Sequence, residues 1–454
     1  MQGDRAEQQC HCCCRRREQP PSVSCHLSIP FVTAPSITGP WSDPVPVHAR
    51  GFDPSLYHDP DGRSWLLSVE CDWRPGRPWA GGIIAQEYHR RERRLVGEPV
   101  RIFAGTSAGM TEGPHLYRRG GWYYLITAEG GTSWEHQVTV ARSRSVLGPY
   151  EADPAGPMLT SLHRPDLALQ KAGHGSLVAT AEGEWFLAHL VGRPLEPRGR
   201  CVLGRETALQ RVEWTGDDWP RVRDGIPAER IAAPALPEHR WQPAHHTDNF
   251  TGPELAPRWS TLRRPASEDW VSLTERPGHL RLRGGRSPSS RHDVSIVGQR
   301  VQHLAAVFET VLEFRPTSFQ EMAGLIAYYN TRNWHYLRVS RHGKAGTAVD
   351  VLSCDRGRLS LTGPAVPVGE RTLLRAELDR DRLRLDVGEP GGPVTNWLGT
   401  FDASILSDEY AVEFYDDVAR VWGFTGMFFG LCAHDLSGGA AVADFDHVSY
   451  RPLA

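Results

Sequence analysis

Thr111-Glu-Gly-Pro-His-Leu-Tyr117, followed after two arginines by Gly120-Gly-Trp-Tyr-Tyr-Leu-Ile126, is the stretch that decides the fold. A carboxylate stands just ahead of a Gly-Pro pair and a short strand pattern. A Gly-Gly turn and a strongly aromatic strand pattern come next, so the stretch predicts two strands joined by a tight turn.

Two other segments repeat this arrangement. Asp53-Pro-Ser-Leu-Tyr57 precedes a turn and Trp65-Leu-Leu67, and His174-Gly-Ser-Leu-Val178 precedes a turn and Trp185-Phe-Leu187. The three copies align on leucines that lie 60 and 61 residues apart: Leu56, Leu116 and Leu177.

A repeat of this length, built from strands and tight turns, is typical of a β-propeller, whose four-stranded blades surround a central channel. If the repeated segment is the innermost strand of each blade, then Asp53, Glu112 and His174 converge at the axis from consecutive blades. Three ionisable groups at one axis are hard to explain by packing alone. They are therefore the candidate site.

Composition excludes some functions. The formal net charge of −3 and the isoelectric point near 6.7 give no reason to expect a nucleic-acid or membrane partner. No apolar run reaches the roughly 18 residues of a transmembrane helix. Four scattered cysteines fit reduced thiols and predict a cytoplasmic location: Cys71, Cys201, Cys354 and Cys432.

The first 30 residues have a different composition. Arg15-Arg-Arg17 is not followed by the apolar segment of a signal peptide, and His11-Cys-Cys-Cys14 lacks the paired spacing of a zinc module. Residues 1–30 are therefore predicted to be a disordered or misassigned leader.

The rest of the chain divides into two β-rich parts. Residues 31–235 are predicted to form a partial β-propeller, in which Gly204–Trp214 reads as a fourth unit, and residues 236–247 form a linker. Residues 248–454 carry many short alternating strand patterns and almost no helical periodicity, which predicts a β-sandwich. The predicted fold class is all-β.

Several motifs in a fixed order resemble those of a known family. In the first part they are Gly51-Phe-Asp-Pro-Ser-Leu56, Thr111-Glu-Gly-Pro-His-Leu-Tyr117, Lys171-Ala-Gly-His-Gly-Ser-Leu177 and Leu203-Gly-Arg-Glu-Thr207, and in the second Met322-Ala-Gly-Leu325, Tyr328-Tyr-Asn330 and Phe424-Thr-Gly426. With these motifs the chain resembles glycoside hydrolase family 43, in the branch of β-xylosidases and α-L-arabinofuranosidases with a C-terminal concanavalin A-like sandwich. The resemblance implies a five-bladed propeller with the site on its axis.

The resemblance also implies roles. Glu112 is the general acid that protonates the leaving glycosidic oxygen, and Asp53 is the carboxylate that raises its pKa and orients it. His174 lies near the axis, where a central water or a calcium ion is bound. Arg205 hydrogen-bonds substrate hydroxyls, and Phe424 of the sandwich domain reaches over the pocket. No cofactor is required, although a calcium ion near His174 stays open.

The chemistry fits these roles, because a neighbouring carboxylate keeps a general acid protonated through like-charge repulsion. Simpler readings exist. An Asp before Pro-Ser often only caps a turn, an axial His can merely fill the core, and Arg205 can pair with Glu206 or Glu213.

One family feature has no counterpart here. The general base of the family is an Asp near the start of the first blade, in a segment like Gly-Phe-x-Pro-Asp-Pro, and nothing in this sequence matches it. The propeller-like part spans about 200 residues, fewer than five blades of ~50–60 residues need. We therefore expect an N-terminally incomplete propeller that lacks the first blade and its base.

Two functions follow as hypotheses. The first is an inverting hydrolase that removes xylosyl or arabinosyl residues from oligosaccharides derived from hemicellulose, inactive if the base is absent. The alternative is a non-catalytic carbohydrate-binding protein that uses the aromatic residues Trp73, Trp79 and Trp134. The expected partner is a xylo- or arabino-oligosaccharide, and sandwich-bearing members of the family often form homo-oligomers.

Overall fold

The computed structural model describes residues 29–72, 74, 77, 79–240, 245–415, 418–439 and 441–453. The chain forms two compact units, described separately here. The first comprises residues up to Val191 and Thr207–Pro237, and the second comprises Gly192–Glu206 and the residues from Glu238 onward. The predicted leader lies outside the described residues, apart from Ile29 and Pro30.

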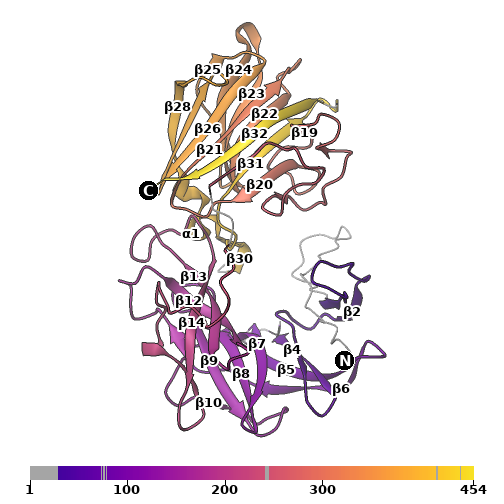
Figure 1. Cartoon of the computed structure of the whole chain (residues 1–454), viewed down its shortest axis with the longest axis vertical. Helices are drawn as coiled ribbons and strands as arrows, with labels where there is room; N and C mark the ends of the chain where they lie inside the picture. Colours follow the sequence, from indigo (N-terminus) through magenta and orange to yellow (C-terminus); the bar gives the residue numbers. More distant parts are fainter. Residues whose placement is uncertain are drawn as a thin grey trace. The chain divides into compact units, whose positions relative to one another are not determined.

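Three sheets in the first unit have the strand order of propeller blades (Figure 1). The first contains β3 (Ser55–His58), β4 (Ser64–Cys71), β5 (Ala80–His89) and β6 (Arg94–Phe103). The second contains β7 (Glu112–Arg119), β8 (Trp122–Glu129), β9 (Gln137–Ser143) and β10 (Glu151–Ala152), with β11 (Leu159–Thr160) also paired to β9. The third contains β12 (Gln170–Ala179), β13 (Trp185–Gly192), β14 (Glu206–Trp214) and β15 (Pro220–Val222).

The repeated motif provides the first strand of each sheet. These strands lie at one end of their sheets, yet β3 contacts β7 and β7 contacts β12, as neighbouring inner strands of a propeller do. The prediction of a propeller-type, all-β fold is therefore confirmed. The predicted fourth unit is wrong: Gly204–Trp214 does not start a new blade, because β14 pairs within the third sheet.

Apolar strand faces explain why these sheets pack. Leu67 and Ile83 of the first sheet are fully buried with Leu125 of the second, whereas Ile126 and Leu187 belong to the cluster between the second and third sheets. Alternation along β8 thus divides its side chains between two cores. A two-stranded sheet of β1 (Ile29–Phe31) and β2 (Val45–His48) completes the described strands of this unit.

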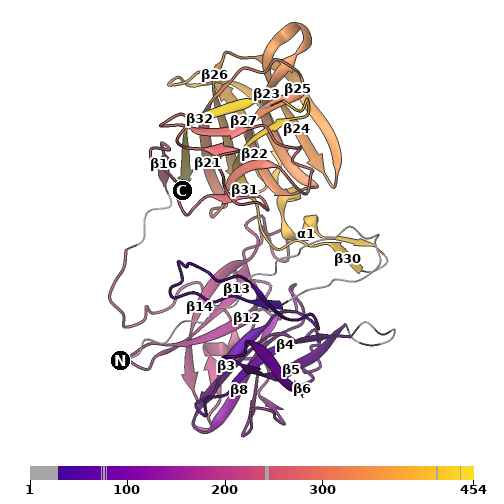
Figure 2. The same cartoon turned by 90° about the vertical axis from the view of Figure 1, so that its right-hand side faces the viewer.

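The second unit is a β-sandwich of two sheets (Figure 2). One sheet has the order β18-β19-β32-β21-β26-β27-β28, with β16 paired to β32, and the other β17-β20-β31-β22-β23-β24-β25. The strands of the first are β16 (His246–Asp248), β18 (Val271–Ser272), β19 (Leu280–Arg283), β21 (Ala305–Phe314), β26 (Arg371–Asp379), β27 (Arg382–Gly388), β28 (Val394–Asp402) and β32 (Val442–Pro452). Those of the second are β17 (Ser260–Thr261), β20 (Ser295–Arg300), β22 (Glu321–Asn330), β23 (Asn333–His342), β24 (Gly346–Asp355), β25 (Arg358–Pro367) and β31 (Phe428–Asp435).

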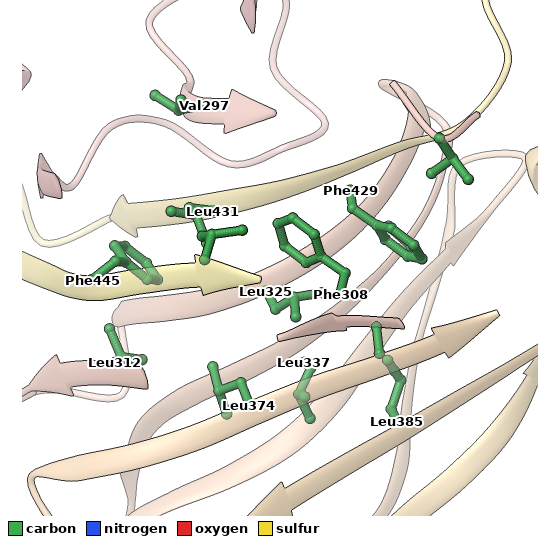
Figure 3. Packing of buried hydrophobic residues seen from close by; sticks show 14 of the residues in the cluster. Val297, Phe308, Leu312, Leu325, Leu337, Leu374, Leu385, Phe429, Leu431 and Phe445 are labelled. Carbon is green, nitrogen blue, oxygen red and sulfur yellow. The ribbon is translucent and has the colours of Figure 1, made fainter. Parts of the chain in front are cut away.

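The core of the sandwich lies between these sheets. Figure 3 shows Phe308, Leu374 and Leu385 of the first sheet with Leu325 and Phe429 of the second. The rings of Phe308 and Phe429 stack with their centroids 5.3 Å apart. The predicted β-sandwich is thus confirmed. Short elements accompany the sheets: η1 (Arg223–Gly225) in the first unit, and η2 (Gly343–Ala345), η3 (Ala403–Leu406), α1 (Asp408–Ala411), β29 (Glu413–Tyr415) and β30 (Val418–Val421) in the second. None of the helices in the described ranges is long and apolar enough to cross a membrane.

Gly192–Glu206 comes from the middle of the propeller sequence but packs in the second unit. Val202 and Leu203 are buried in the sandwich core, and the Met427 N–H donates a hydrogen bond to the Val202 carbonyl at 2.9 Å. The sequence-based boundaries had assigned this segment to the propeller domain.

Candidate active site

Glu112 is the first residue of β7, where its backbone pairs with Ala128 of β8. The residue is buried, with 8 % of its surface exposed. Gly113 follows with a φ of 58°, and the register between β7 and β8 shifts between Glu112 and His115. A bulge of this kind re-aims side chains and is common beside active sites.

Asp53 immediately precedes Pro54 and β3, on the neighbouring inner strand. Its carboxylate Oδ2 accepts a hydrogen bond from the backbone N–H of Gly113 at 3.1 Å. The half-buried Asp53 thus contacts the residue next to Glu112, although the two lie 59 positions apart in the sequence. The structure thus places the Asp53 carboxylate against the backbone that directly follows Glu112.

His174 approaches the same point from β12. A Cβ built on Gly113 would lie 2.9 Å from Cε1 of the His174 imidazole, so this ring occupies the space that a side chain at position 113 would need. Burial, followed by the charge of His174, lowers the pKa of His115 to about 4. His115 is therefore a neutral imidazole at neutral pH.

Lys171 lies three residues before His174 on β12 and contacts Trp134. The Lys171 Nζ is 4.8 Å from the centroid of the half-buried Trp134 ring, and the Lys171 carbonyl oxygen is 3.0 Å from Nδ1 of the buried His136. A cation near an aromatic face is attracted by the ring quadrupole. Of the other predicted aromatic residues, Trp73 lies outside the described residues, and Trp79 stacks on Phe52 with the ring centroids 4.9 Å apart.

Arg205 and Phe424 meet in the second unit. The guanidinium carbon of Arg205 is 4.0 Å from the Phe424 ring centroid, and Phe424 stacks on Trp422. Gly204 and Gly426 allow this contact, because a Cβ at Gly204 would lie 2.3 Å from the backbone nitrogen of Gly426. Glu206 instead pairs with Arg193 through two hydrogen bonds of 2.8 Å.

The structure therefore groups the predicted residues into two sets. In the first unit, Asp53 and His174 both lie against Gly113, directly after Glu112, and Trp134 contacts Lys171 of the same strand as His174. In the second unit, Arg205 contacts Phe424. Sequence reasoning had not singled out His115 or Lys171 as site residues. His115 lies within the quoted motif three positions after Glu112, which was the available signal.

The family resemblance left open a calcium ion near His174. Over the described ranges, no group of three or more His, Cys, Asp or Glu side chains is arranged to hold a metal ion. Calcium prefers a shell of six to eight oxygen ligands.

The first unit carries a buried glutamate and a second carboxylate on neighbouring inner strands, and the second unit is a β-sandwich. This combination fits a glycoside hydrolase, which cleaves glycosidic bonds with paired carboxyl groups. Family models agree with this class. Residues 15–220 match glycosyl hydrolases family 43, and residues 247–451 match the β-xylosidase C-terminal concanavalin A-like domain.

Individual relatives extend the match over most of the chain. The β-xylosidase of Bacillus subtilis is 39% identical over 94% of this chain and 81% of its own length, and the xylosidase/arabinosidase 43B of Humicola insolens is 39% identical over 93% and 79%. The crystal structure of xylan β-1,4-xylosidase from Bacillus halodurans superposes with a TM-score of 0.88 at 45% identity, covering 93% of this chain and 81% of that one. The chain belongs to glycoside hydrolase family 43.

Proposed function

We propose that the chain hydrolyses xylosyl or arabinosyl residues from the non-reducing ends of hemicellulose-derived oligosaccharides, with inversion. The observation that carries this proposal is the contact between the Asp53 carboxylate and the Gly113 N–H, beside the buried Glu112. The similarity to xylosidases and to a xylosidase/arabinosidase supports the substrate class.

Glu112 acts as the general acid in this proposal. It gives its proton to the glycosidic oxygen while the bond from that oxygen to the anomeric carbon breaks, and the leaving group departs as a neutral alcohol. A water molecule attacks the opposite face of the sugar ring and loses its proton to a base. The sequence contains no match to the family's motif for that base, so no residue is assigned to it.

Asp53 keeps the Glu112 carboxyl group protonated for this step. A negative charge next to a carboxylic acid favours the protonated form of the acid, which the reaction requires. The hydrogen bond from the Gly113 N–H holds the Asp53 carboxylate in place. Arg205, whose position rests on Phe424, is proposed to hydrogen-bond substrate hydroxyls on the basis of the family resemblance.

The test is hydrolysis of p-nitrophenyl xyloside, p-nitrophenyl arabinofuranoside and xylobiose by the purified chain, with Glu112→Gln as the matched variant. General acid catalysis contributes about 10²–10⁴-fold, so Glu112→Gln should lower kcat on xylobiose by such a factor while binding persists. An α-configured xylose as first product, seen by NMR, would establish inversion of a β-xyloside.

The alternative is carbohydrate binding without turnover, which the half-buried aromatic ring of Trp134 beside the Lys171 ammonium supports. In that case calorimetry would detect binding of xylobiose by the wild-type chain, binding would be unchanged by Glu112→Gln, and no substrate would be hydrolysed by either protein.

A further inference from the structure

Glu129 is a fully buried carboxylate that the sequence reasoning did not use. It is the last residue of β8 and has 0 % exposure. Its Oε1 accepts hydrogen bonds from the Thr106 N–H and the Thr111 hydroxyl, both at 2.7 Å. Its Oε2 accepts from the hydroxyls of Thr106 at 2.5 Å and Thr139 at 2.7 Å. A buried charge is tolerated only when its hydrogen bonds are satisfied, and both oxygens here meet that condition.

Two of the three donating threonines, Thr106 and Thr111, belong to residues 104–111, the segment that leads into β7. Thr106 lies within this segment, and Thr111 is its last residue, directly before Glu112. Gly105, with a φ of 89°, lets this segment pack tightly against the Glu129 carboxylate. A Cβ at Gly105 would lie 1.9 Å from Thr111 Oγ1 and 2.8 Å from Glu129 Oε1. The Gly130 N–H also donates to the Gly109 carbonyl at 2.8 Å. The segment is thus fastened to the end of β8.

The strand register separates Glu129 from the reacting side. Glu112 pairs with Ala128, so Thr111 stands beside Glu129 on the adjoining pair of positions. Successive side chains of a strand point to opposite faces. Thr111 and Glu129 therefore hold the start of β7 from the face that Glu112 does not use.

We propose that Glu129 is a positioning residue for Glu112. Its carboxylate fixes Thr111 and with it the backbone from which the general acid projects. Glu129 touches no reacting atom in this scheme, and its shortest connection to Glu112 passes through the hydroxyl of Thr111. This inference rests on the proposed function of Glu112.

Two threonines allow a matched test. Thr111 and Thr139 are both buried, with 3 % and 4 % exposure, and each hydroxyl donates to Glu129 at 2.7 Å. Thr→Val removes the hydroxyl with little change of shape at either position. Thr111→Val cuts the connection to Glu112, whereas Thr139→Val removes an equivalent hydrogen bond from β9, away from Glu112.

The measured quantity is how strongly kcat depends on the leaving group of the substrate. Xylobiose has a poor leaving group and needs the proton of the general acid, whereas a dinitrophenyl xyloside has a good leaving group and hardly needs it. Because misplacement of a catalytic group by about 1 Å can cost up to about 10²-fold in rate, we expect Thr111→Val to lower kcat on xylobiose by about 10-fold or more. Its KM and its turnover of the dinitrophenyl xyloside should change little. Thr139→Val should leave the ratio of the two rates at the wild-type value, and Thr111→Ser, which keeps the hydroxyl, should restore it.

Equal losses on both substrates in Thr111→Val, or the same change of ratio in Thr139→Val, would overturn the positioning role. Thermal unfolding of every variant separates loss of fold from loss of alignment. If Thr111→Val does not fold, Glu129→Asp, which withdraws the carboxylate by one methylene, takes its place in the same comparison. Absence of turnover in the wild-type chain on both substrates would instead refute the proposed function itself, and the positioning role with it.

Discussion

Replacement of Gly113 by alanine tests the geometry of the site most directly. The φ of Gly113 is 58°, and a Cβ at this position would lie 2.9 Å from Cε1 and 3.0 Å from Nε2 of His174. A non-glycine residue in the left-handed region costs about 1–2 kcal/mol. Forcing a methyl group against a packed ring costs about 1–3 kcal/mol more.

Gly120 provides the control. It lies in the turn between β7 and β8 with a φ of 57°, and a Cβ there would have nothing within 4 Å. Gly120→Ala therefore carries the backbone cost alone. We expect it to lower the free energy of unfolding by about 1–2 kcal/mol, whereas Gly113→Ala should lower it by about 2–5 kcal/mol.

Both variants are compared by thermal unfolding and by turnover of p-nitrophenyl xyloside. For a domain of 150–250 residues, 1 kcal/mol shifts Tm by about 2–4 °C. Gly113→Ala should also lose at least about 10-fold in kcat, because displacement of His174 and of the Gly113 N–H disturbs the Asp53 contact. Equal Tm and equal kcat in the two variants would show that His174 does not lie against Gly113, and the proposed convergence of the three strands would be wrong.

Three further predictions concern charge, pH and the core. Asp53→Asn removes the negative charge beside Glu112, so the acid loses its proton at lower pH, and the alkaline limb of the kcat/KM profile should move to lower pH; an unmoved limb would exclude Asp53 as the modulating carboxylate. Burial lowers the pKa of His189 to about 4, below the value of about 6.5 in the unfolded chain, so the unfolded state binds the proton first and stability should fall by up to about 3 kcal/mol as the pH drops from 6.5 toward 4. Denaturant unfolding across this range should show a shallower slope for His189→Gln, and an identical slope would contradict the assignment. Phe308→Ala should cost the second unit about 3–5 kcal/mol, measured by denaturant unfolding, because the ring is fully buried against Phe429; a loss below about 1 kcal/mol would contradict the core packing described here.

The repeat explains why so much of the first unit was predictable. Turn residues and aromatic strands recur with the leucines Leu56, Leu116 and Leu177, and a pattern that recurs three times specifies strand type and register together. Convergence of Asp53, Glu112 and His174 followed from that register without any knowledge of side-chain contacts.

Contacts between distant segments were beyond such reasoning. The hydroxyls around Glu129 come from Thr106, Thr111 and Thr139, which share no spacing that a sequence pattern could reveal. From its position in the sequence, Gly192–Glu206 was assigned to the propeller domain. In the structure it belongs to the second unit, because Val202 and Leu203 pack in the sandwich core. The prediction that β14 opens a new blade was wrong, because local sequence patterns do not specify which strands pair with one another.

The backbone itself gives an independent reason to regard the axis of the first unit as functional. Among non-glycine residues with a positive φ in the described part of the chain, only Lys171 and His174 lie within a β-strand, with φ of 55° and 50°. Asp53, with a φ of 49°, stands two residues before another inner strand. Each such residue costs about 1–3 kcal/mol and persists only where the surroundings over-determine it. Turns explain left-handed residues between strands, but they do not explain these three. The backbone conformations of Asp53 and His174 bring a carboxylate and an imidazole ring against Gly113, and that of Lys171 accompanies the contact of its Nζ with Trp134. Such positions are expected where binding geometry, and not sheet stability, decides the backbone conformation.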